Sequence, residues 1–175
     1  SIDFLQMDNK LPTRIVKVNR DNSGERYFSG FDPSYQTAFA DEALNRKLIE
    51  NDLKNLEKLF LETKYLVTGT IVLSSALSEE SIYFLLSLAK KFDVKLIIDL
   101  NWREVFWENS SYSSKFSKKK RINLIKNFLD SAHILKLAKE EAIFFFENAD
   151  PFEISQKILN RPDVVITDGG NTISW

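Results

Sequence analysis

The stretch VKLIIDLNWREVFW, residues 94–107, decides the fold, because an apolar run in it gives way abruptly to polar side chains. Residues 94–98 are almost continuously apolar, which is typical of a strand in a parallel sheet rather than of a strand with one wet face. Asp99, Asn101 and Arg103 then place an acid, an amide and a guanidinium at alternate positions. The sequence therefore predicts a buried strand that ends at a polar edge.

Other segments repeat this pattern of strand and helix along the chain. YLVTGTIVL (residues 65–73) reads as a strand that opens into a loop at Thr68–Thr70, and AHILKLA (132–138) as a strand. DVVITDGGNTISW (163–175) reads as a strand, a Gly turn and another strand. Apolar residues at helical spacing mark 44–60, 82–92 and 122–129. Ser78 is expected to cap the second of these helices, and Asp150, followed by Pro151, to cap a further one. The alternation predicts an α/β fold with a parallel sheet covered on both faces.

The N-terminal residues 1–34 are expected to form a separate small unit, ahead of an α/β core at 35–175. Apolar and polar residues alternate in TRIVKVNR (13–20) and RYFSGF (26–31), which is typical of paired strands with one wet face. Asp21–Gly24 between them is turn chemistry, because these residues tolerate positive φ or bond their own backbone. The segment is thus predicted to be a β-hairpin that ends near Pro33.

Composition narrows the function classes. The 175 residues fit one domain, and 24 basic against 25 acidic residues leave no excess charge that would favour nucleic acid or an anionic membrane. No apolar run approaches the roughly 20 residues that a membrane span needs, and no signal peptide is evident, so a cytoplasmic protein is expected. The absence of cysteine excludes disulfides and thiolate sites. His133 stands alone and is expected to be a packed core residue, so a His-rich metal site is excluded.

Polar clusters follow each of the four expected strands directly, at Thr68–Thr70, Asp99–Arg103, Lys136–Glu141 and Thr167–Asn171. Ligands gather outside the carboxyl ends of the strands in an open parallel sheet, so these clusters are expected to converge on one edge. Two readings of the Asp99 cluster stand side by side. Asp99 and Asn101 are common as simple caps of backbone amides at a strand end, whereas the guanidinium of Arg103 suits a phosphate or carboxylate.

Five blocks in order resemble the PfkB (ribokinase-like) carbohydrate kinases, and the fructokinases most closely: GERYF (24–28), VTGTIVL (67–73), DLNWREVFW (99–107), ILKLAKEEA (134–142) and VVITDGGNT (164–172). The resemblance implies a ribokinase-like three-layer sandwich with a mostly parallel central sheet and a small β lid. It also implies a kinase that uses ATP and Mg2+ to phosphorylate a hydroxyl of fructose or a similar sugar. A homodimer formed through the lid is implied as well.

The resemblance assigns roles to individual residues. Arg103 would stabilise charge during transfer, and Glu141 would be associated with Mg2+. Gly69 and Thr70 would face the sugar, and residues 13–31 would form the lid over it. The nucleotide would be bound by Asn101, Arg103, Thr167, Asp168, Gly169, Gly170 and Asn171.

The chain departs from the family pattern at three points. Ala138 stands where the family has Asn, and Thr172 where it has the last Gly of the nucleotide loop. The segment FSGFDPS (28–34) lacks the Arg that fructokinases carry before their Pro-Ser step. The family's upstream sugar-binding block and its Gly-Ala-Gly-Asp segment, which holds the catalytic base, are not present, so these 175 residues are expected to be a fragment that is inactive alone.

Three readings of function stay open from the sequence. The leading one is the central part of a fructokinase-like enzyme. A second changes the substrate to a ketodeoxy sugar acid or a nucleoside. A third, favoured by Ala138 and Thr172, is a non-catalytic fructokinase-like binding or regulatory protein, for which a plastid location is the alternative to the cytoplasm.

Overall fold

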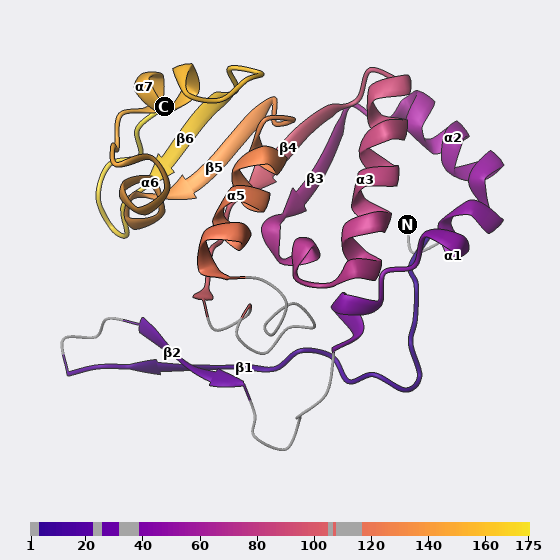
Figure 1. Cartoon of the computed structure of the whole chain (residues 1–175), viewed down its shortest axis with the longest axis horizontal. Helices are drawn as coiled ribbons and strands as arrows, with labels where there is room; N and C mark the ends of the chain where they lie inside the picture. Colours follow the sequence, from indigo (N-terminus) through magenta and orange to yellow (C-terminus); the bar gives the residue numbers. More distant parts are fainter. Residues whose placement is uncertain (1–3, 23–25, 32–38, 105–106, 108–116) are drawn as a thin grey trace.

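The structure is a computed structural model that describes residues 4–22, 26–31, 39–104, 107 and 117–175. Four strands form one sheet in the order β3-β4-β5-β6, and every neighbouring pair is parallel. Their bounds are β3 Tyr65–Gly69, β4 Lys95–Asp99, β5 Ile134–Ala138 and β6 Asp163–Thr167. The predicted parallel sheet is therefore confirmed (Figure 1).

Helices connect the successive strands. A short 3-10 helix η2 (Thr70–Ser74) and α3 (Ala76–Lys91) join β3 to β4, α5 (Lys118–Leu129) leads into β5, and α6 (Lys139–Phe146) and α7 (Pro151–Gln156) join β5 to β6. The start of α7 confirms its sequence signal, because the Asp150 side chain accepts a hydrogen bond of 3.0 Å from the Glu153 N–H.

Only one face of the sheet is covered by the described helices. Sequential strand order with right-handed crossovers places the connecting helices on the same side, and α3 and α5 lie together in front of the sheet (Figure 1). The side chains beneath them are buried: Leu96, Ile98, Leu135, Leu137, Val164 and Ile166. On the opposite face Tyr65 and Val67 are 53% and 66% exposed. The described residues thus supply two of the three layers of a ribokinase-like sandwich.

The helical segment before β3 differs from its expected continuous stripe. It contains a 3-10 helix η1 (Ala40–Ala43) and two helices, α1 (Arg46–Asn51) and α2 (Leu53–Glu62). Asp52, between α1 and α2, has φ −120° and ψ 28°, so the helix is interrupted there. Leu56 and Phe60 still pack in a cluster with α3, but Leu48 is exposed.

The expected cap of α3 at Ser78 was wrong by one turn. The helix begins at Ala76, and its cap is Ser75, whose hydroxyl accepts a hydrogen bond from the Ser78 N–H. The Ser78 hydroxyl instead donates to the carbonyl oxygen of Asp41 at 2.9 Å. Three serines of this region bond carbonyls of 41–44 in this way, which ties η1 to α3.

The predicted hairpin is present as β1 (Val16–Arg20) and β2 (Arg26–Phe31), paired antiparallel. It lies on the side to which the carboxyl ends of the sheet strands point (Figure 1). Residues 23 and 24 of the predicted turn lie outside the described residues. Arg14 anchors its base, because the guanidinium lies 2.9 Å from Asp41 and 2.8 Å from Glu42 and stacks over the Phe39 ring. Burial raises the pKa of the Glu42 carboxyl, and the charge of Arg14 opposes that rise. The division at residue 34 stays a prediction.

Across the described ranges, none of the helices has the length and apolar character that crossing a membrane requires.

Candidate functional site

The turn after β4 is held in a strained conformation. The Leu100 N–H still bonds to the carbonyl of Lys136 at 2.9 Å, which continues the sheet pairing. Asn101 then adopts φ +38°, in the left-handed region that costs most residues free energy but that Asn tolerates. The backbone leaves the strand conformation at this residue, and the next amide, that of Trp102, donates to Glu141 near the start of α6.

The buried carboxylate of Glu141 accepts hydrogen bonds from this segment. One of its oxygens, Oε1, accepts hydrogen bonds from the Trp102 N–H at 2.6 Å and from Arg103 Nη1 at 3.1 Å. The other, Oε2, accepts from the Ala138 N–H at 2.8 Å. Glu141 is only 5% exposed. We call this set of contacts, formed by Glu141, Trp102, Arg103 and Ala138, the Glu141 clamp.

Two further cation–carboxylate pairs lie at the same edge. Lys136 Nζ is 3.1 Å from Asp99 Oδ1, and Lys139 Nζ is 2.8 Å from Asp168 Oδ2. The hydrogen bond from Lys139 lowers the pKa of the Asp168 carboxyl, and the same bond raises the pKa of Lys139. Together with Arg103 and Glu141, these pairs connect the ends of three successive strands.

The loop after β6 is an exposed turn. The Asn171 N–H donates to the carbonyl of Asp168 at 2.8 Å, and Gly169 has φ +55°, which favours glycine. A Cβ added at Gly169 or Gly170 would meet no atom within 4 Å. The loop therefore leaves open space beside its backbone, and Thr167, at the end of β6, begins it.

The end of β3 is packed more tightly. Gly69 lies in register with Asp99, and a Cβ added to it would lie 3.4 Å from the carbonyl oxygen of Asp99. Thr70 is 1% exposed, and its hydroxyl donates to the carbonyl oxygen of Leu100. The hydroxyl thus serves to join the ends of β3 and β4.

The described residues do not fit the Mg2+ site that the sequence resemblance implied for Glu141. Both oxygens of that carboxylate are engaged with protein donors. Among the residues that the structure describes, no group of three His, Asp or Glu side chains is placed to hold a metal ion.

The sequence therefore located the edge but not its pairings. Asn101, Arg103, Glu141, Asp168 and Gly69 all lie at the carboxyl ends of adjacent strands, as expected. The roles of Lys136 and Lys139 as partners of Asp99 and Asp168 were missed. A signal was available for the first pair, because Asp99 and Lys136 occupy equivalent positions in neighbouring parallel strands.

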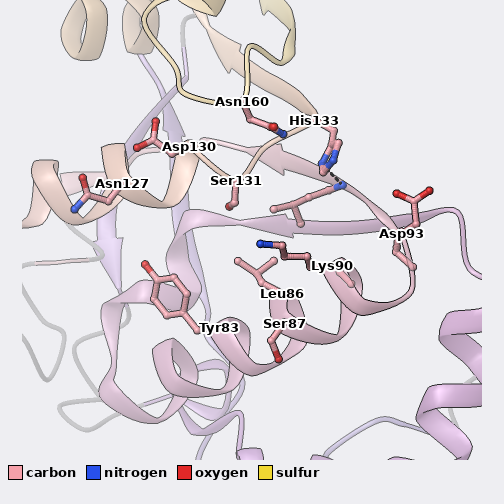
Figure 2. A pocket seen from close by; sticks show the side chains of 13 residues that line it. Tyr83, Leu86, Ser87, Lys90, Asp93, Asn127, Asp130, Ser131, His133 and Asn160 are labelled. Atoms are coloured by element: carbon pink, nitrogen blue, oxygen red, sulfur yellow. Dashed lines mark hydrogen bonds between the residues drawn. The ribbon is translucent and has the colours of Figure 1, made fainter.

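A separate cavity of about 490 Å³ lies at the opposite, amino ends of the strands, between α3 and α5 (Figure 2). Its floor includes Val94 and Leu96, and His133 lies on its rim. His133 Nδ1 accepts a hydrogen bond of 3.1 Å from the Leu96 N–H. Burial, followed by the nearby charge of Lys95, lowers the pKa of His133. His133 is thus half-buried beside a cavity rather than packed in the core.

Several solved structures share this fold. A fructokinase from Xylella fastidiosa superposes with a TM-score of 0.69 at 20% identity, covering 98% of this chain and 50% of that one. The chain has the fold of a fructokinase. A Vibrio cholerae fructokinase gives a TM-score of 0.67 at 20% identity over 98% of this chain and 50% of that one. A PfkB protein from a Polaromonas species gives 0.67 at 14% identity over 95% and 51%.

The resemblance deduced from the sequence is thus confirmed for the ribokinase-like fold. The chain spans about half the length of these kinases. No protein-family model matches the sequence, and no curated protein matches it.

Proposed function

We propose that the chain is the central part of an ATP-dependent sugar kinase of the PfkB type, which transfers a phosphoryl group to a hydroxyl of fructose or a similar sugar. One observation carries the proposal: in a fold shared with fructokinases, Arg103 and the loop 167–171 lie at the carboxyl edge of the parallel sheet. The Xylella fastidiosa fructokinase has been solved with bound ATP, and that of Vibrio cholerae with fructose, ADP and a calcium ion.

The residues at this edge have chemistry that suits such a transfer. Phosphoryl transfer depends mainly on positioning and on stabilising charge that develops on the phosphate oxygens. We assign Arg103 to that charge, and Asn101 with Thr167, Asp168, Gly169, Gly170 and Asn171 to the nucleotide. Gly69 is assigned to the sugar side, where a side chain would crowd the strand edge. Glu141 is not assigned to Mg2+, because its oxygens already accept three hydrogen bonds from protein donors.

The hairpin β1–β2 is assigned to a lid over the sugar. Val18 is 49% exposed, so the hairpin carries apolar surface that a closed substrate site or the hairpin of a second copy would cover. Exclusion of water from a phosphoryl-transfer site is the usual task of such a lid. A homodimer formed through the two hairpins is the corresponding proposal for partners.

A second candidate is a non-catalytic protein with the kinase fold. Ala138 removes an amide side chain from the start of α6, and Thr172 stands in the nucleotide loop where the family has glycine. Both replacements reduce the means of binding a nucleotide. Loss of ATP binding in the full-length protein would favour this candidate.

The test is ATP consumption by the full-length protein across a panel of sugars, with Arg103→Ala as the variant. Removal of one charge-stabilising group typically costs on the order of 100-fold or more in turnover, so we expect a loss of that size. The control is Arg46→Ala, since Arg46 is on α1 and pairs with Glu50 and Glu80 rather than with the residues at the strand ends. Unchanged turnover in Arg103→Ala would return the Asp99 cluster to simple strand capping. Turnover by these 175 residues alone would refute their predicted inactivity.

A further inference from the structure

We propose that Glu141 is a positioning residue that fixes the Asn101 turn and the guanidinium of Arg103 for an anionic ligand, and that it is not a metal ligand. The identity of the anion, a nucleotide phosphate, rests on the proposed function. The positioning role itself rests on the contacts of the Glu141 clamp.

The hydrogen bonds of Glu141 account for both of its oxygens. The Trp102 N–H and Arg103 Nη1, both distant from Glu141 in sequence, donate to it at 2.6 and 3.1 Å. The Ala138 N–H, three residues before Glu141, donates at 2.8 Å. Glu141 is 5% exposed, and a buried polar group is tolerated when such donors satisfy it. A metal ion at Glu141 would compete with donors that the buried backbone needs, since an unpaired buried amide is costly, and no other His, Asp or Glu of the described residues joins it in a group of three that could complete a metal site.

The clamp acts first on the backbone. Asn101 is in the left-handed region, which Asn tolerates better than most residues but which still costs free energy unless neighbouring contacts hold it. The hydrogen bond from the next amide, Trp102, to Glu141 is the contact that links this turn to α6. Removing that acceptor therefore frees the turn to relax.

The clamp acts next on the side chain of Arg103. Its Nη1 donates both to the Trp102 carbonyl at 2.7 Å and to Glu141 at 3.1 Å, while the side chain is 33% exposed. Nη1 thus helps to fix the guanidinium, while the side chain remains partly exposed. An arginine held in place before binding loses less side-chain entropy when a ligand arrives.

The start of α6 is not itself the anion site. Glu140 and Glu141 fill its first turn, and Glu141 occupies the Ala138 N–H. Carboxylates at a helix start oppose the binding of another anion there. The geometry therefore directs the ligand to the Arg103 side of the clamp.

The experiment compares Glu141→Gln with Glu140→Gln, the exposed neighbour in the same helical turn. ATP affinity is measured in EDTA and in excess Mg2+. We expect Glu141→Gln to weaken binding about tenfold in both conditions, equivalent to one lost charge-assisted contact, and Glu140→Gln to leave it unchanged. A loss confined to the Mg2+ condition would overturn the proposal. In an Arg103→Met background Glu141→Gln should add a smaller loss, the part that acts through the Asn101 backbone; an undiminished loss there would also overturn the proposal.

Two further measurements keep the outcomes distinct. Glu141→Asp preserves the charge but shortens the reach, so positioning predicts a loss as large as that of Gln, whereas a retained affinity contradicts it. Hydrogen exchange of the Trp102 amide should accelerate in Glu141→Gln without any ligand. If the wild-type protein binds no ATP, the nucleotide function fails, and the exchange rate alone decides the positioning role: an unchanged rate refutes it.

Discussion

Thr70→Val tests the role of a buried hydroxyl at the junction of β3 and β4. The variant keeps the shape of the side chain and removes the group that donates to the Leu100 carbonyl. Thr70 is 1% exposed, so no water replaces the missing donor. The carbonyl of Leu100, itself a buried residue, is left with less hydrogen bonding. Leaving a buried polar group unsatisfied typically costs about 1–3 kcal/mol.

The assay is urea unfolding at constant temperature, with thermal unfolding as a second measure. For a chain of this size about 1 kcal/mol corresponds to roughly 2–4 °C in Tm, so the expected fall is roughly 2–12 °C. The slope of the urea transition should stay unchanged, because the surface exposed on unfolding is the same.

Thr68→Val is the matched control for this variant. Its hydroxyl donates only to the adjacent Gly69 carbonyl at 3.2 Å in a half-buried position, so a change within about 0.5 kcal/mol is expected. If Thr70→Val unfolds at the wild-type midpoint, the reasoning from burial fails. If it instead lowers sugar binding without lowering stability, the hydroxyl serves the sugar, as the family resemblance implied.

Three other predictions concern charge and burial. Lys139→Met should raise the pKa of Asp168 toward its ordinary value, as measured by carboxyl NMR, and an unshifted pKa would contradict the pairing. In the wild-type protein the lowered pKa of Asp168 contributes stability above the unfolded-state pKa, and this contribution is lost as pH falls through the folded-state pKa. Burial lowers the pKa of the His133 imidazole, so we expect it to titrate below its ordinary value of about 6.5. The free energy of unfolding should therefore decrease as pH falls below about 6.5, and His133→Gln should remove this pH dependence. An elevated pKa of His133 would contradict the role of burial. Val67→Lys, on the open face of the sheet, should change the free energy of unfolding by less than about 0.5 kcal/mol, whereas Leu137→Ala, under the helices, should cost about 2–5 kcal/mol. Equal losses in these two variants would show that both faces are packed.

Local signals in the sequence predicted much of the fold. Apolar runs that end on polar residues located all four parallel strands, and Asp150 with Pro151 marked the start of α7 correctly. These features depend on residues close together in the chain, so a short window contains the relevant physics. The shared edge followed from the general rule for parallel sheets.

Features that depend on distant contacts were not predictable in this way. The break at Asp52 interrupts a stripe whose apolar spacing alone favours a continuous helix. The true cap at Ser75 depends on η1, whose carbonyl groups engage the hydroxyl of Ser78. The clamp on Glu141 joins residues 38 and 39 positions apart, and no local pattern distinguishes such a carboxylate from an exposed acid at a helix start.

The open face of the sheet has a consequence for how this sequence tolerates substitution. Strands β3 to β6 carry apolar residues on both faces, yet only alternate side chains lie beneath α3, α5 and their neighbours. In a saturating mutational scan selected for folding, polar substitutions should therefore be tolerated at every second residue along these strands if the second face remains open. If another helical layer covers that face in the functional protein, the alternation in tolerance of polar substitutions should disappear. The mutational scan would therefore distinguish a sheet covered on one face from a sheet covered on both.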